Sequence, residues 1–144
     1  MIQLEILREW AALLQADSEL SRLTGGRITA GLFRPDDAID LPAIVIEHDS
    51  DERLPSGTNV AVDHVLRGTA VIAAEGSPFA AGLAEIGRAI HRITSQIEDF
   101  SATNGQLIQI EGPFSQSARD ELEPNIVRLE MSYLFSYQVP IGKI

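Results

Sequence analysis

Two of the three histidines, with the carboxylates near them, are the residues of this sequence best suited to bind a metal ion. His48 and His64 flank a polar stretch, and Glu47, Asp49 and Asp63 lie beside them. If the flanking segments pair as a hairpin, the two imidazoles could face each other across it and recruit these carboxylates. Their spacing matches no metal-ligand motif, so we favour the simpler interpretation that they are solvent-facing hairpin residues.

Other kinds of catalytic or cofactor site have no recognisable motif. The sequence contains no cysteine, which excludes disulfides, thiolate nucleophiles and cysteine-ligated metal centres. It has neither a phosphate-binding glycine loop nor a G-x-S-x-G nucleophile elbow. Asp49-Ser50-Asp51 begins like a calcium loop, but Leu54 and Val60 stand where glycine and glutamate are required. We therefore predict no enzymatic activity, no cofactor and no metal.

The composition is that of an acidic globular protein. Its 144 residues carry 21 acidic and 11 basic side chains, which gives a formal net charge of -10. Such a surplus disfavours a nucleic-acid binder that works by neutralising phosphates. The length suits one domain over residues 1–144, and no apolar run approaches the ~20 residues that span a bilayer. The N-terminus lacks the basic region of a signal peptide, so we expect the cytoplasm or a particle assembled there.

Two long amphipathic helices are predicted from apolar residues spaced three and four apart. The first covers residues 2–16. A short helical turn at 19–23 follows, for which Asp17 and Ser18 are the candidate caps and which Gly25-Gly26 stops. The second long helix opens at Ser77-Pro78. Its apolar stripe, which we expect to pack on a sheet, comprises Phe79, Leu83, Ile86, Ile90, Ile93 and Ile97.

Segments rich in β-branched or alternating apolar residues predict the strands. A weak strand at 27–32 precedes stronger ones at 41–47, 60–74, 107–114 and 126–139. The polar residues 49–59 are expected to form the projecting tip of a long hairpin. The element order is α-(β)-β-β-α-β-β. We therefore predict an α+β fold, a mostly antiparallel sheet with two main helices on one face.

A few apolar residues have no obvious place in a single core. They are Leu54 in the hairpin tip and Val139, Ile141 and Ile144 in the C-terminal tail, residues 139–144. Together with the projecting hairpin, these residues suit docking on neighbouring molecules. Frayed loops and a frayed terminus explain them equally well on the residues alone.

The order of elements and two short motifs resemble one known family. Gly25-Gly26-Arg27-Ile28 leads from the first helix into a variable loop, and Leu41-Pro42-Ala43-Ile44-Val45-Ile46 opens the hairpin. With the second long helix and two final strands ending in alternating aromatics, the pattern spans about residues 2 to 138. It resembles the tail terminator, or tail-completion, proteins of tailed bacteriophages and phage-derived particles. No catalytic residues carry over, because the family has none.

The resemblance implies a structural virion protein that is assembled in the bacterial cytoplasm. Such proteins form a ring, commonly of six subunits, on the head-proximal end of the tail tube. The ring stops tube polymerisation and contacts the neck or connector. DNA would pass through it without specific binding, which suits the acidic charge. The resemblance also implies that sheet edges and the C-terminal residues 138–144 bind ring neighbours. The interface residues that we expect are Asp49, Asp51, Glu52, Arg53, Leu54, Arg88, Arg92, Val139, Ile141 and Ile144.

Two alternative functions stay open at this point. One is another head–tail joining protein of the neck, which would share the same partners. The other is a small α+β enzyme or ligand-binding domain that uses His48, His64 and the nearby carboxylates as its site.

Overall fold

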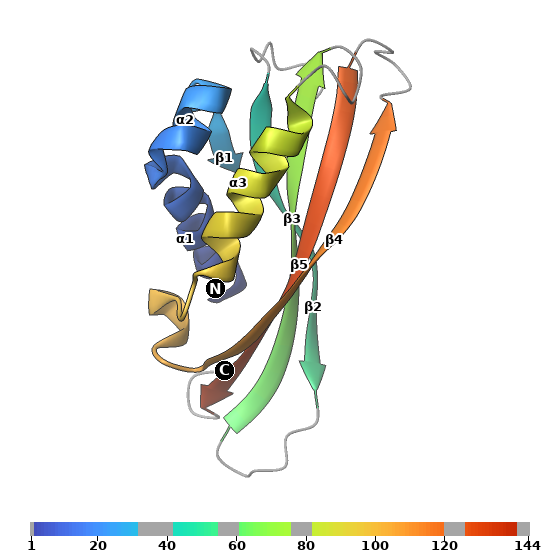
Figure 1. Cartoon of the computed structure of the whole chain (residues 1–144). Helices are drawn as coiled ribbons and strands as arrows, with labels where there is room; N and C mark the ends of the chain where they lie inside the picture. The colour runs from blue at the N-terminus through green and yellow to red at the C-terminus, as the bar shows by residue number, and fades with distance from the viewer. Residues whose placement is uncertain (1, 32–41, 55–60, 76–81, 120–125, 141–144) are drawn as a thin grey trace.

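Among the residues that the structure describes, three α-helices pack on one face of a five-stranded sheet (Figure 1). The computed structural model describes residues 2–31, 42–54, 61–75, 82–119 and 126–140. The helices are α1 (Ile2–Ala16), α2 (Ser18–Thr24) and α3 (Leu83–Ser95), followed by a 3-10 turn, η1 (Ser101–Thr103). The strands are β1 (Ile28–Ala30), β2 (Ala43–Leu54), β3 (Ala61–Glu75), β4 (Leu107–Arg119) and β5 (Ile126–Pro140). None of these helices is long and apolar enough to cross a membrane.

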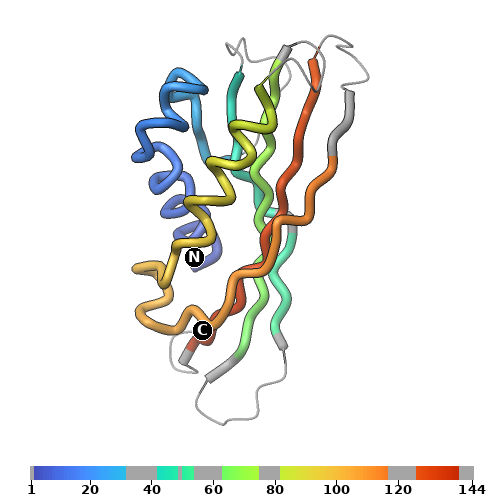
Figure 2. Tube along the Cα trace, in the orientation of Figure 1, coloured from blue at the N-terminus to red at the C-terminus, as the bar shows by residue number. Residues whose placement is uncertain are grey.

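The strands are arranged in the order β1-β2-β3-β5-β4. β1 runs parallel to β2, and the other neighbouring pairs are antiparallel. This arrangement confirms the predicted α+β fold with a mostly antiparallel sheet and helices on one face. The strands cross about half-way along in Figure 1, because the sheet is strongly twisted. β4 forms one edge of the sheet, and the tube trace in Figure 2 follows it from the turn after η1 to the opposite end.

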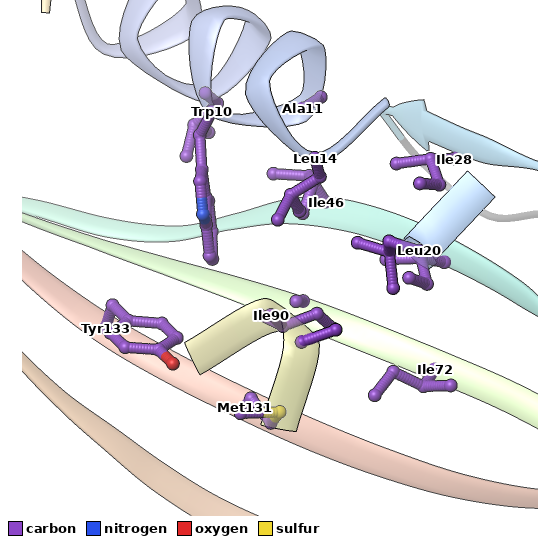
Figure 3. Close-up of a cluster of buried hydrophobic side chains, with 14 of the residues drawn as sticks. Trp10, Ala11, Leu14, Leu20, Ile28, Ile46, Ile72, Ile90, Met131 and Tyr133 are labelled. Atoms are coloured by element: carbon purple, nitrogen blue, oxygen red, sulfur yellow. The ribbon is translucent and has the colours of Figure 1, made fainter. Parts of the chain in front are cut away.

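The core lies between the sheet and the apolar faces of α1 and α3. Figure 3 shows Trp10 extending from α1 toward the sheet. Its indole Nε1–H donates a hydrogen bond to Thr94 Oγ1 of α3 at 3.0 Å. The indole also packs edge-on against Tyr133 and Phe135 of β5, with ring centroids 5.5 and 5.2 Å apart. One side chain therefore joins both long helices to the central strands.

β2 and β4 are longer than their apolar patterns predict. The sequence places a hairpin tip at 49–59, but residues 49–54 belong to β2 and pair with β3 as far as Leu54 opposite Asp63. The polar residues 115–119, which follow the predicted strand 107–114, likewise belong to β4 and pair with β5. Both predictions are wrong for the same reason: backbone pairing in a ladder does not require apolar side chains.

α3 begins later than the sequence predicts. Gly82 precedes its first residue with a φ of 70°, in the left-handed region that glycine adopts without strain. Ser77-Pro78, the predicted start, and Phe79 lie outside the described residues. The apolar stripe is confirmed from Leu83 onward, because Leu83, Ile86 and Ile90 are buried against the sheet. The helix ends at Ser95, although Ile97 still packs against the core.

Asp17 links the start of α2 to the end of α3. Its carboxylate accepts the Leu20 backbone N–H at 3.0 Å, as an N-cap, and receives Arg92 Nη2 at 3.0 Å. Arg92 also reaches Glu19 at 3.4 Å. The Leu20 hydrogen bond, together with Arg92, holds the pKa of Asp17 below its usual 3.8. The predicted cap is confirmed, and it also holds α2 against α3.

We expect Asp17→Ala to lower the free energy of unfolding by about 1 kcal/mol through loss of the cap. Asp17→Asn keeps a capping acceptor and is expected to lose much less. The charge contribution should be complete above pH 3.8 and should disappear as the pH falls through the lower folded-state pKa. Urea denaturation of the three proteins between pH 2 and 7 measures this, and equal losses for both variants would contradict the capping role.

Candidate interaction surfaces

The predicted hairpin-tip residues lie on both faces of β2. Glu52 and Arg53 are exposed, as expected for interface residues. Asp51 pairs with the buried Leu66 on the helix-covered face, and its side chain is only 12% exposed. The expectation that Asp51 projects from a loop is therefore wrong, because the strand turns alternate side chains inward. Asp49 and Leu54 belong to β2, but their side chains lie outside the described part of the structure.

Four elements meet at Asp51. Gln3 of α1 donates its side-chain amide to Asp51 Oδ2, and the Tyr137 hydroxyl of β5 lies 3.5 Å from the same oxygen. His64 of β3 stacks on Tyr137 with ring centroids 5.2 Å apart, and its Nδ1 is 3.6 Å from Asp51 Oδ1. We call these four residues the polar cluster. It ties the beginning of α1 to three strands.

The polar cluster is incompletely hydrogen-bonded. Asp51 Oδ1 and both ring nitrogens of His64 are buried without a hydrogen-bond partner. Burial, together with the negative charge of Asp51, raises the pKa of Tyr137 above its usual value, so the phenol stays protonated and can donate. An unpaired buried oxygen facing an unpaired ring nitrogen is a destabilising arrangement.

Asp51→Asn is expected to stabilise the protein by about 1 kcal/mol, because it replaces the unpaired Asp51 Oδ1 with a group that can donate. The asparagine oxygen can still accept from Gln3, and its amide nitrogen can donate to His64 Nδ1. Thermal and urea denaturation measure the gain. In a His64→Phe background the same substitution should give no gain, because the acceptor is missing. A loss of stability in the wild-type background would show that the carboxylate charge itself is required.

The two arginines of α3 that are predicted at an interface, Arg88 and Arg92, differ in the groups that surround them. Arg92 is 43% exposed, but its guanidinium binds Asp17 and Glu19 of the same chain. Its role as a bridge to a neighbouring subunit stays a prediction. Arg88 is exposed and lines a groove of about 770 Å³ between α3 and the β4–β5 side of the sheet. Leu129 and Met131 contribute apolar surface to that groove.

The prediction that the C-terminal tail, residues 139–144, has no place in the core is wrong for Val139. Val139 is only 4% exposed and belongs to the core as part of β5. The backbone of Val139 pairs with Val62 of β3, and β5 ends one residue later at Pro140. Ile141 and Ile144 lie outside the described residues, so their interface role stays a prediction.

The histidines do not form the metal site considered from the sequence. His48 lies opposite Gly68, whereas His64 lies opposite Arg53, so the two histidines are not cross-strand partners. No group of three or more histidines and carboxylates suited to a metal ion exists within the described ranges. His91 is exposed, and it stacks on Tyr133 with its Nδ1 3.2 Å from the Tyr133 hydroxyl. Burial raises the pKa of Tyr133 to about 12.

Sequence reasoning expected sheet edges to bind neighbours but did not identify β4 as an edge strand or its apolar residues as exposed. Ile108 and Phe114 of β4 are 58% and 51% exposed, although they are large and apolar. Phe114 borders a polar hollow of about 640 Å³ on the helix-free face. The buried hydroxyls of Thr69 and Ser132 meet at 2.8 Å in the wall of this hollow. In the sequence, Ile108 and Phe114 look like core residues. Only the strand order, which places β4 at an edge of the sheet, explains why they are exposed.

A scan against protein-family models finds no match, and a search of curated proteins finds none either. A search of solved structures finds a chain of a particle described as "Virion of native gene transfer agent (GTA) particle". The two folds superpose with a TM-score of 0.62 over 90% of this chain and 92% of that one. Sequence identity is 14%, so the comparison shows a shared fold.

Proposed function

We propose that this protein is a structural component of a phage-like virion, a tail terminator that forms a ring on the head-proximal end of a tail tube. The observation that carries the proposal is the fold shared with a chain of the gene transfer agent virion, which covers nearly the full length of both chains. The order of elements, with the G-G-R-I and L-P-A-I-V-I motifs, supports the finer assignment to the tail terminator family.

The surfaces described above suit assembly. A neighbouring subunit can bury apolar surface on the edge strand β4, where Ile108 and Phe114 are exposed. It can match the charge of Arg88 in the groove that this residue lines. A heterologous interface of this kind closes into a ring when its rotation is a whole fraction of a turn. The ring would bind the tail tube on one side and the neck or connector on the other.

The net charge of -10 per subunit suits a ring through which DNA slides. Acidic walls repel phosphate and reduce sticking within the Debye length of about 8 Å at physiological salt. A head–tail joining protein of the neck is the second candidate. It shares the same support from the virion fold and differs in binding the neck without stopping the growth of tubes.

Electron microscopy of the purified protein with assembling tail tubes tests the proposal. We expect rings of uniform diameter at one end of each tube and shorter tubes when the protein is in excess. Tubes assembled with a Trp10→Ala variant, argued below to be destabilised, serve as the control. A protein that stays monomeric and never binds tubes would contradict the proposal. Rings that bind the neck but leave tube length unchanged would favour the joining protein.

A further inference from the structure

The sheet bends along one row of residues. His48 of β2, Gly68 of β3 and Tyr133 of β5 are consecutive cross-strand partners in this row. β2 has one extra residue just beyond this row, between His48 and Ser50. β4 shifts its register at the same level, between Glu111 and Phe114. Bulges at the same level in two strands bend and twist a sheet locally. We call the part of the sheet beyond this row, on the side of Leu54, the distal half-sheet.

Among the described residues, no strand pairs with either edge of the distal half-sheet. Its four segments are 50–54 of β2, 63–67 of β3, 134–138 of β5 and 107–111 of β4. β1 pairs only with Ile44–Ile46 of β2, so it stops short of this half. No strand of the described chain covers the outer edge of β2 here, and none covers the outer edge of β4. Two rows of backbone donors and acceptors therefore face outward at the same level.

The strand directions make these two edges complementary. Each neighbouring pair from β2 through β3 and β5 to β4 is antiparallel, so β2 and β4 run in opposite directions. When subunits are related by rotation about a ring axis, the β4 edge of one copy meets the β2 edge of the next in an antiparallel pair. This continues the hydrogen-bonding pattern of the sheet across the subunit boundary.

The side chains at these edges support pairing. Ile108 is the extra residue where β4 shifts register between Leu107 and Gln109, and it is 58% exposed. Monomeric edge strands are usually protected by charged residues, whereas an exposed isoleucine is a liability unless a partner covers it. Glu52 of β2 and Gln109 of β4 lie in one row, joined through Val65 and Ser136. They therefore point to the same face of the sheet and would become neighbours across the boundary.

We propose that a second copy of this chain is the partner of the distal half-sheet, with 107–111 of one copy pairing antiparallel with 50–54 of the next. The inference rests on the proposed ring and specifies how its subunits join. The bulges limit the pairing to this half of each edge, and Ile108 becomes buried between the copies. The same contact repeats at each boundary and leaves neither edge of the distal half-sheet unpaired in a closed ring.

Cross-linking tests the arrangement directly, because the protein has no cysteine of its own. In the double variant Glu52→Cys/Gln109→Cys, a short bifunctional maleimide should join copies into a ladder that ends at the closed ring. Each single variant should remain uncross-linked. Dimers formed as readily by Gln109→Cys alone would overturn the proposal in favour of β4 pairing with its own copy.

Ile108→Lys tests the contact without engineered thiols. We expect loss of rings, or at least a roughly tenfold higher concentration for assembly, since burying one isoleucine contributes about that factor. Leu13→Lys, on the outer face of α1 and 42% exposed, is the matched control and should assemble normally. Circular dichroism should show that both variants fold. Rings that persist in Ile108→Lys, with no ladder in the cysteine pair, overturn this inference alone. Cross-linked rings that never bind tubes would instead contradict the proposed function.

Discussion

Replacing Trp10 by alanine should lower the free energy of unfolding by about 3–5 kcal/mol, the typical cost of removing a large buried aromatic side chain. Trp10 has no exposed surface and contacts both long helices and β5. Its removal leaves a cavity between α1 and the sheet and leaves the Thr94 hydroxyl without its indole donor. Because domains of this size are stable by only about 5–15 kcal/mol, the variant should be partly unfolded under mild conditions.

Urea denaturation followed by far-ultraviolet circular dichroism measures this effect, since Trp10 is the protein's only tryptophan and its fluorescence is lost in the variant. Leu13→Ala is the matched control, because Leu13 lies on the same helix but is 42% exposed. It should cost less than about 1 kcal/mol. Equal losses in the two variants would mean that α1 is held by something other than its buried face.

Gly68→Val should be the second most damaging substitution, with an expected loss of about 2–3 kcal/mol from overpacking. A Cβ at Gly68 would lie 2.7 Å from Leu7 Cδ2 and 3.3 Å from the Trp10 ring. The branched methyl groups of valine would extend further and push α1 away from β3. Glycine is unusual in the interior of a strand, and here the close approach of a helix requires it.

Gly87→Ala provides the control for this effect. A Cβ at Gly87 meets Leu129 and Met131 at 3.3 and 3.4 Å, which is a milder contact beside an open groove. The glycine is inside α3, where alanine favours the helix by about 1 kcal/mol. We expect no loss, or a small gain, in the denaturation midpoint. If Gly68→Val were tolerated as well as Gly87→Ala, the packing of α1 on β3 would be looser than the structure shows.

Much of the fold follows from local periodicity. The three-and-four spacing of apolar residues predicts α1 with its observed bounds, and strict alternation predicts β5 to within a residue at its end. The N-cap at Asp17 is equally local, because a carboxylate before a helical turn satisfies a free backbone N–H. Patterns of this kind report which side of an element is buried, and they need no knowledge of its neighbours.

The predictions fail where burial depends on distant parts of the chain. Asp51 has the sequence context of a solvated loop, yet β3, β5 and α1 enclose it. Val139 lies near the end of the last strand, where the sequence predicts an exposed tail, yet it pairs with Val62 of β3 and is buried in the core. In both cases the deciding contacts come from segments far away in the chain.

The sequence by itself determined the acidic charge, the absence of thiol chemistry, the identity of the main helices and strands, and the α+β class. These properties follow from composition and from short-range periodicity. Only the tertiary structure decided that β4 is an edge strand, that the two bulges lie on one row, and that Ile108 is exposed. The physical reason is that strand order and register are set by pairing between segments far apart in the chain, which no local pattern contains.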